Sequence, residues 1–184
     1  MTPVIEALLE RSSEPRLQSP APDQHTLDKA FACAARAPDH ALLRPWRYLV
    51  VSGDGLAKLG ELFASTLGAE ATAKARDKLL GAPLRAPMII VGIACHQPHP
   101  KVPEQEQTMS AAVGMGYLIL ALQSAGFGAM WRSGPMASHP AVIEGLGLAS
   151  HELITGFLYT GTVVSEKPRV PRPEPSSFVS QWPF

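Results

Sequence analysis

The order of apolar and polar residues along the chain predicts several helices and a few short strands. Residues 88–94 form a continuous apolar run directly after Pro87, a pattern typical of a strand buried on both faces. An apolar-rich segment over 104–125 stops at Gly126-Phe127-Gly128 and predicts a long helix. Four small residues inside this segment would let a second helix approach closely: Ala111, Ala112, Gly114 and Gly116.

The same periodicities predict the remaining elements. We expect strands over residues 46–51, 88–94, 129–132 and 152–160. We expect helices from Thr2-Pro3 to Arg11, through Leu27 to about Arg36, over 56–80 with a break near Gly68, over 104–125, and from Ser138 and Pro140 to about 145–147.

Proline dominates the C-terminal segment from about residue 166 onward. A segment with this many prolines forms neither a helix nor a central strand, so we expect an extended arm lying over a surface. Its prolines are Pro168, Pro171, Pro173, Pro175 and Pro183. Because no internal repeat or domain linker interrupts the chain, we expect residues 1–184 to form one domain that carries this arm.

Composition limits the classes of function. The chain has 184 residues, is 46% hydrophobic and 17% charged, and can therefore bury a substantial core. Lysine plus arginine and aspartate plus glutamate number 16 each, which argues against a polybasic surface for nucleic acid or membranes. The longest nearly apolar stretch, 111–122, is too short to span a bilayer, and the first residues do not form a signal peptide. We expect a soluble, cytoplasmic protein that binds neither nucleic acid nor membrane.

The cysteines and histidines do not indicate a metal site. Cys33 and Cys95 stand in apolar surroundings and are expected to be buried, reduced thiols. Cys95, His96 and His99 have a spacing that zinc could use, but no second ligand pair accompanies them. The chain also lacks a nucleophile elbow, a Walker phosphate loop and a strand-linked dinucleotide fingerprint.

Candidate chemistry lies in three short polar segments. Arg36-Ala37-Pro38-Asp39-His40 follows a helical segment, and Pro38 biases Ala37 away from helical geometry, which predicts a rigid turn rich in polar groups. Arg11-Ser12-Ser13 offers a guanidinium and hydroxyls suited to a phosphate, although such a cluster alone is more often a solvated helix end. Trp131-Arg132-Ser133-Gly134 could line a flat polar ligand, and a simple strand end explains it equally well.

In combination, these segments resemble the nitroreductase family, and most of all its small single-domain bacterial NAD(P)H nitroreductases. Each motif is modest, but their joint order and spacing are specific, and they extend from the first helix to the last strand. The motifs are Arg11-Ser12-Ser13-x-x-Arg16, Arg36-Ala37-Pro38-Asp39-His40, Pro45-Trp46-Arg47, Lys101-Val102-Pro103, Glu106-Gln107-x-Met109-Ser110, Gly126-Phe127-Gly128 and Trp131-Arg132-Ser133-Gly134.

The resemblance implies an α+β fold, a mainly antiparallel sheet surrounded by helices, in an intertwined homodimer with two FMN molecules at its interface. Arg11, Ser12 and Ser13 would hold the FMN phosphate, and Arg36 and His40 would reach the same flavin from the partner subunit. Trp131, Arg132 and Ser133 would line its isoalloxazine or phosphate end. Residues 121–126 correspond to the segment assigned to NADH or NADPH in relatives: Ala121, Leu122, Gln123, Ser124, Ala125 and Gly126.

Two departures from the family pattern affect flavin binding. Ser12 stands where the family usually has a second arginine, so other cations would contribute more to the phosphate. The candidates are Arg16, Arg132, Lys167 and Arg169. Ala41-Leu42-Leu43-Arg44 also replaces the asparagine and glutamine with which larger relatives meet the pyrimidine edge of the flavin.

The implied activity is ping-pong hydride transfer through flavin N5 from NAD(P)H to a nitroaromatic, a quinone or a similar electron-poor small molecule. Since flavin carries the chemistry, no side chain is expected to act as a catalytic acid or base. A cation such as Arg36 or Arg132 near flavin N1 and O2 would stabilise the reduced anion. The alternatives are an FMN-binding module for storage or sensing without turnover, and a structural dimer without a cofactor.

Overall fold

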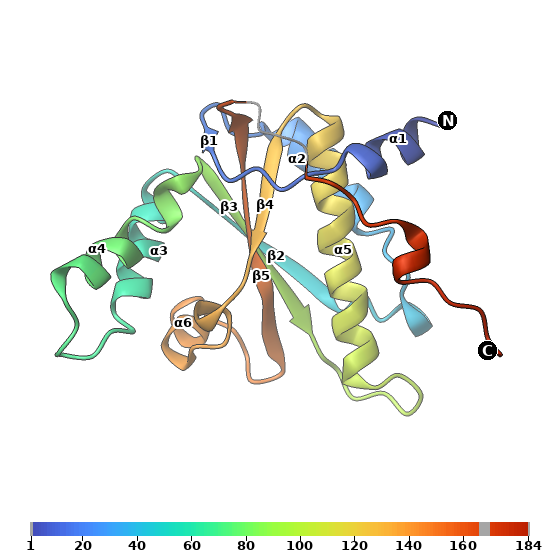
Figure 1. The fold of residues 1–184 in the computed structure, drawn as a ribbon. Coiled ribbons are helices and arrows are strands. Elements are labelled where there is room, and N and C mark those ends of the chain that lie inside the picture. Colours follow the sequence, from blue (N-terminus) through green and yellow to red (C-terminus); the bar gives the residue numbers. More distant parts are fainter. Residues whose placement is uncertain (1, 166–169, 184) are drawn as a thin grey trace.

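The computed structural model describes residues 2–165 and 170–183, and an antiparallel β-sheet forms its centre (Figure 1). The strands are β1 (Leu17–Gln18), β2 (Trp46–Ser52), β3 (Met88–Cys95), β4 (Gly128–Arg132) and β5 (Glu152–Val163). Their order is β1-β5-β3-β2, and β4 pairs with β5 beside β1. Every pair is antiparallel, as expected from the resemblance.

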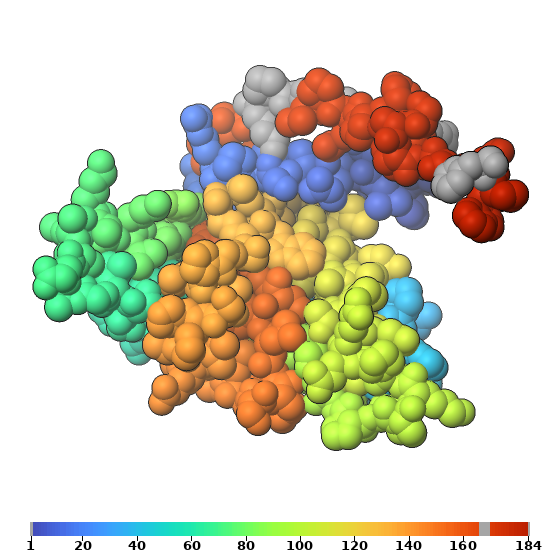
Figure 2. All heavy atoms as spheres, turned by 60° about the horizontal axis from the view of Figure 1, so that its bottom comes forward, coloured from blue at the N-terminus to red at the C-terminus, as the bar shows by residue number. Residues whose placement is uncertain are grey.

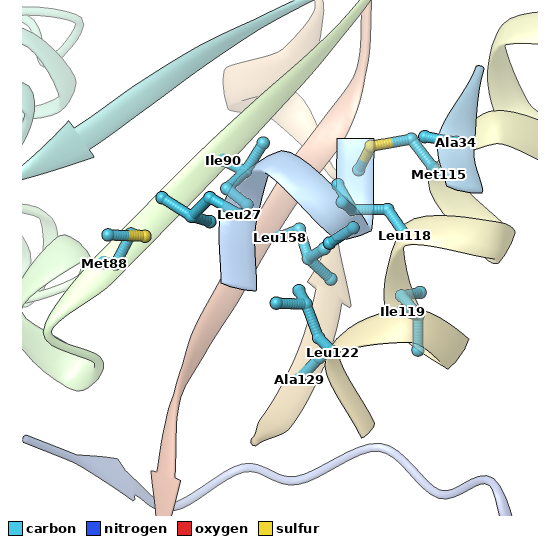
Figure 3. Packing of buried hydrophobic residues seen from close by; sticks show 11 residues of the cluster. Leu27, Ala34, Met88, Ile90, Met115, Leu118, Ile119, Leu122, Ala129 and Leu158 are labelled. Atoms are coloured by element: carbon cyan, nitrogen blue, oxygen red, sulfur yellow. The ribbon is translucent and has the colours of Figure 1, made fainter. Parts of the chain in front are cut away.

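Helices cover both faces of this sheet (Figure 1). They are α1 (Pro3–Glu10), α2 (Gln24–Ala34), α3 (Asp54–Ala64), α4 (Ala73–Leu80), α5 (Glu104–Ser124) and α6 (Pro140–Gly145). On one face, α2 and α5 enclose an apolar cluster with the sheet, part of which Figure 3 shows. On the other face, α3 and α6 enclose a second cluster. The arrangement is the predicted α+β fold.

Strand β3 explains why the sheet has two cores. Its side chains alternate, so that Met88 and Ile90 enter the cluster with α2 and α5, whereas Ile89 and Val91 enter the cluster with α3 and α6. All four are buried. The uninterrupted apolar run therefore has the predicted cause, because neither face of this strand meets water.

Helix α5 lies along the sheet, and its small residues admit α2. A side chain at Gly114 would bring its Cβ to 3.3 Å from the carbonyl oxygen of Ala34, in α2. The predicted close approach of a second helix is thus confirmed at this position. The buried amide of Gln107 joins the first turn of α5 to the preceding loop, because it accepts from the Gln97 amide and donates to the Gln97 and Val102 carbonyls.

Several details differ from the expectations. Cys33 is exposed rather than buried, because the buried face of α2 is formed by Leu27, Ala30 and Ala34. Helix α6 begins after His139, whose ring accepts from the Ala141 amide, rather than at Ser138. Strand β1 was not predicted, because two residues are too few to show the alternation of apolar and polar positions that marks a strand. They form a strand only because β5 extends beyond residue 160 and pairs with them.

The described part of the C-terminal arm is extended except for one 3₁₀ turn over Pro175–Ser177. It lies along α1 and the segment that follows α1 (Figures 1 and 2). There the Arg172 guanidinium donates a hydrogen bond to the Arg11 carbonyl. Lys167 and Arg169, two of the predicted phosphate cations, lie outside the described residues.

An ion pair joins β2 to β5 across the end of the sheet. Arg47 donates from Nε and a terminal nitrogen to the two carboxylate oxygens of Glu152, at 2.6 and 2.7 Å. The Glu152 side chain is 9% exposed and also accepts from the Ala149 amide and the Cys95 thiol. Hydrogen bonding from Arg47 lowers the pKa of Glu152 to about 2, and burial raises the pKa of Cys95 to about 11.

We expect Glu152→Gln to lower the free energy of unfolding by about 2 kcal/mol at pH 7, the scale of a hydrogen bond to a charged group. In the wild type, acid removes this stabilisation. The unfolded carboxylate binds its proton near its ordinary pKa of 4.5, whereas the folded one resists until about pH 2, so stability falls between these values. Urea unfolding from pH 7 to pH 2.5 measures both effects, with Glu144→Gln on the exposed side of α6 as control. Equal stability of wild type and Glu152→Gln across this range would contradict the assignment.

Candidate functional site

Two of the predicted segments meet on strand β4. Helix α1 ends at Glu10, and the chain continues in an extended conformation through Arg11. The Glu14 amide then donates to the Ala129 carbonyl in β4 at 2.9 Å. Since a strand rises about 3.3 Å per residue, Arg132 stands about 10 Å farther along the same strand. The structure thus places Arg11-Ser12-Ser13 near one end of β4 and Trp131-Arg132-Ser133 at the other.

The first segment gains a second cation from the C-terminal arm. Arg11 is half-buried, and its carbonyl binds the guanidinium of Arg172, which brings the two arginines together. The Ser12 hydroxyl donates to the carboxylate of Glu14. Arg172 was not among the residues predicted for the site, and its only signal in the sequence is a basic residue within a proline-rich tail.

Trp131 is fixed by the sheet beneath it. Its indole nitrogen donates to the Thr155 carbonyl in β5 at 3.1 Å. The indole can lie this close only because the next residue is Gly156, where a Cβ would stand 2.0 Å from the indole nitrogen. The φ of Gly156 is +152°, and the β3–β5 register shifts beside it. The strand irregularity therefore sets the orientation of Trp131.

The residues that follow Trp131 provide a cation, Arg132, and backbone groups that a ligand can reach. The Arg132 guanidinium carbon lies 5.4 Å from the centre of the Tyr159 ring, and its Nε is buried without a hydrogen-bond partner among the described residues. Ser133 and Gly134 are exposed. Gly134 has a φ of +91° and no atom within 4 Å of where a Cβ would lie, so a ligand can approach the backbone there.

His40 does not join this group within one chain. His40 Nδ1 lies 2.9 Å from a carboxylate oxygen of Glu106, in the first turn of α5. The opposite end of α5, at Ala121, lines a groove with α1. Fifteen residues of helix separate the two positions by about 22 Å at 1.5 Å per residue. His40 therefore lies at the other end of α5 from the Arg11 segment, and Arg36 is exposed just after α2.

The turn that carries His40 is held in an unusual backbone conformation. Ala41, Leu42 and Arg44 have φ values of 63°, 54° and 50°, a region that residues with a side chain rarely adopt. The Asp39 carboxylate supports this turn by accepting from the amides of Leu43 and Arg44, at 3.2 and 2.7 Å. The predicted turn is confirmed, and Asp39 clamps it, a role that no pattern in the sequence indicates.

Residues 121–126 are only partly accessible. Leu122 is buried in the core beside α2, so its side chain faces away from any bound nucleotide. Ala121, Ser124 and Ala125 line an apolar groove of about 820 Å³ between α1, α2 and α5. Gly126 is exposed and has a φ of +87°, as expected of a residue that ends a helix.

The histidines of the loop after β3, which were not expected to bind metal, make other contacts. His96 Nε2 lies 2.7 Å from the Thr108 hydroxyl, and His99 accepts from the Lys101 amide. Across residues 2–165 and 170–183, no three His, Cys, Asp or Glu side chains are grouped so that they could hold a metal ion. Within the same ranges, no helix has both the length and the apolar character needed to cross a membrane.

Comparison with known proteins gives consistent matches. The model of the Nitroreductase family matches residues 8–162. The chain is 36% identical over 181 residues to the Escherichia coli K12 protein named "Putative NAD(P)H nitroreductase YdjA", covering 97% of this chain and 98% of that one. A nitroreductase-like family protein from Bacillus cereus has a TM-score of 0.89 at 24% identity, covering 100% of this chain and 98% of the other.

A third match concerns a structure with a ligand. It is described as "a putative nitroreductase in complex with fmn" from Desulfovibrio desulfuricans, with a TM-score of 0.79, 17% identity, and coverage of 100% of this chain and 99% of that one. At these identities the two structural matches show a common fold.

We expect Gly156→Ala to lower the free energy of unfolding by about 3 kcal/mol, because the new methyl group would displace the Trp131 indole and strain a positive φ. Tryptophan emission should change as well. Gly68→Ala, where no atom lies within 4 Å of the added carbon, is the control and should alter stability by less than about 1 kcal/mol. Urea unfolding followed by fluorescence measures both variants. If the two behaved alike, Gly156 would not be required for the position of Trp131.

Proposed function

The chain belongs to the nitroreductase family, and on this basis we propose that it is an FMN-dependent NAD(P)H oxidoreductase that reduces nitroaromatics, quinones or similar electron-poor acceptors. The observation that carries the proposal is the placement of cations, a fixed indole and open backbone along the single strand β4. The relative from Escherichia coli carries NAD(P)H in its name, and a protein of the same fold was solved with FMN.

The Arg11 end of β4 suits the phosphate of FMN. The Arg172 guanidinium binds the backbone carbonyl of Arg11, so this segment gains a second arginine that can serve the same dianionic phosphate. We propose Arg172 as the cation that compensates for Ser12, whose hydroxyl is directed to Glu14. Ser13 follows immediately and completes the motif.

The other end of β4 suits the ring system of the flavin. Trp131, held in place over Gly156, provides an aromatic surface at this end of the strand. The turn at Ser133 and Gly134 leaves backbone groups accessible to the edge of a ring. Arg132 adds a positive charge that is partly shielded from water. A cation near the pyrimidine ring would stabilise the negative charge of the reduced form.

Bound FMN would supply the hydride chemistry of both half-reactions. Over one turnover, a hydride from NAD(P)H together with one proton from solvent reduces a quinone to a quinol, or a nitro group to a nitroso group with release of water. The chain itself contributes binding and orientation and places positive charge, so the proposal requires no catalytic acid or base. Residues 121–126 remain our proposed contact for the nicotinamide nucleotide.

We further propose a homodimer with FMN at its interface. His40 lies at the other end of α5 from the groove that α1 lines, whereas a second copy can present the turn that carries it to the first. The turn over residues 39–44 is held rigidly enough for such a role, with Asp39 as its clamp.

Exposed apolar surface supports the dimer. Helix α1 buries none of its own residues, although Val4, Ile5, Leu8 and Leu9 form its apolar positions. Met109, Val113 and Tyr117 follow each other at one-turn spacing along α5 and are also exposed. The arm residues Phe178 and Val179 are exposed too, and α1, α5 and the arm lie on one side of the molecule (Figure 1). Apolar surface of this extent is typical of a subunit interface.

Spectroscopy of the purified protein tests the function. We expect a yellow protein that is bleached anaerobically by NADH or NADPH and recoloured by a nitroaromatic or a quinone. We expect Arg11→Ala to weaken FMN binding by about 10- to 100-fold, the loss of one charge-assisted hydrogen bond, with less effect on the reactions of bound flavin. Fluorescence titration of the apoprotein with FMN measures this, with Arg76→Ala on the exposed face of α4 as control.

Three outcomes would contradict the proposal. Retention of FMN by Arg11→Ala through gel filtration, with activity lost, would remove Arg11 from the phosphate site. Bound flavin that no nicotinamide reduces would favour the storage or sensing module. A colourless, correctly folded preparation that takes up no FMN would favour the structural dimer.

We expect Val113→Glu to convert a dimer into a monomer at micromolar concentration, because the interface would bury a charge. FMN should be lost together with the partner. Leu84→Glu is the control, since Leu84 is 60% exposed but lies beside α3 and α4, away from the proposed interface. Light scattering after gel filtration, recorded with flavin absorbance, measures both properties. A monomeric wild type, or a monomeric Val113→Glu that retains FMN, would contradict the proposed interface.

A further inference from the structure

A second cationic group surrounds a cavity at the far end of β4. The cavity has a volume of about 160 Å³ and is lined by residues from the end of β4 and from α3 and α4. Lys78 from α4, Arg85 from the 3₁₀ turn over Pro83–Arg85, and Arg132 from β4 contribute three positive charges to its wall. Among the described residues that line it, none is acidic.

We propose that this cavity is the subsite for an anionic group, a carboxylate or a phosphate, carried by the aromatic small molecule that is oxidised or reduced beside it. The inference rests on the proposed function, because it gives the substrate class of the same site. The acceptor would be an aromatic anion. The other molecule with suitable chemistry is the phosphorylated nicotinamide nucleotide.

The charges in the cavity have no ion-pair partner among the residues that the structure describes. No ion pair within residues 2–165 and 170–183 includes Lys78, Arg85 or Arg132. The Nε of Arg132 is buried and donates no hydrogen bond in this part of the chain, which is costly for a guanidinium. Lys78 and Arg85 are exposed at the rim, where they can meet an incoming anion. Three like charges around one small volume repel each other, and a bound anion relieves that repulsion.

Tyr159 adds a donor rather than a charge. Burial raises the pKa of this phenol, although the neighbouring Arg132 and Arg85 act in the opposite direction. The phenol therefore stays protonated at neutral pH, and its hydroxyl is available to donate to an anion. Ser133 lines the same cavity.

The remaining walls are apolar and aromatic. Phe63 and Phe157 meet edge to face with their ring centres 5.3 Å apart, and Leu79 and Met136 complete the lining. Such walls favour an anionic group attached to a flat apolar body over a free inorganic ion. The volume is below the roughly 300 Å³ at which complete ligand sites begin, so the cavity holds one end of a molecule whose remainder lies outside it.

The FMN phosphate does not account for this cluster. FMN carries one phosphate, and we have proposed Arg11 and Arg172 for it. Neither of these arginines is among the residues that line the cavity. Lys78 and Arg85, which the proposed flavin site does not use, are therefore left for an anion that belongs to another molecule.

Paired substrates test the subsite. We compare 4-nitrobenzoate with 4-nitrobenzamide, which has the same shape without the charge, in the oxidative half-reaction, and NADPH with NADH in the reductive half-reaction. For the double variant Lys78→Gln/Arg85→Gln, we expect the ratio of kcat/KM for the more negatively charged to the less negatively charged partner to fall at least about 10-fold in one of the two half-reactions, the loss of a charge-assisted contact. The half-reaction affected identifies the source of the anion. Lys74→Gln/Arg76→Gln, on the same helix α4 but outside the cavity, should leave both ratios unchanged.

A binding measurement separates this inference from the proposed function. Calorimetric titration of the apoprotein with 4-nitrobenzoate should show tighter binding than 4-nitrobenzamide, and the Lys78→Gln/Arg85→Gln variant should lose the difference. This binding comparison remains informative even if no nicotinamide nucleotide reduces the flavin, in which case only the proposed function fails. Unchanged ratios in both half-reactions, together with equal binding of the two benzoic derivatives, would overturn the subsite. Weaker FMN retention in the double variant with equal losses for both partners would assign the cavity to the cofactor and overturn it as well.

Discussion

The pairing of β4 with β5 is the constraint on which the candidate site depends. Strand β5 spans twelve residues, and along one of its edges it accepts β1 and β4 one after the other. The chain that enters β1 must therefore pass beside the start of β4, where the Glu14 amide binds the Ala129 carbonyl. This brings the Arg11 segment to one end of β4 and leaves Arg132 at the other. Gly156 completes the arrangement, since only a residue without a side chain lets β5 receive the Trp131 indole.

The distribution of apolar surface has the same structural origin. Strand β3 and both faces of the sheet are covered by helices of the chain itself, so the core is closed within one protomer. Helix α1 and the outer side of α5 are not covered in this way, although their sequences are apolar. A second copy would cover them and would also bring the Arg36 and His40 turn to a flavin bound on β4. One association would thus satisfy both the exposed apolar surface and the separation of the predicted flavin ligands.

Much of the fold could be predicted from the sequence because its signals are local. The apolar run of β3, the glycine stop after α5 and the proline before His40 each act over a few residues, and the structure has all three features. Predictions failed at β1 and Cys33, where packing against other elements decides, and at the start of α6, where a local cap decides. Strand β1 exists only because β5 pairs with it, Cys33 is exposed because other residues of α2 face the sheet, and α6 begins where the His139 ring caps it.

For the candidate site, the sequence by itself determined the chemical groups, their order along the chain and the family in which that order occurs. Tertiary structure alone decided which of them share a location. It joined Arg172 to Arg11 and gathered Lys78, Arg85 and Arg132 around one cavity, and it kept His40 apart at the other end of α5. The physical reason is that hydrophobic periodicity specifies each helix or strand independently of the others. The distance between side chains on different elements follows instead from strand pairing and helix packing, which join residues that are far apart in sequence.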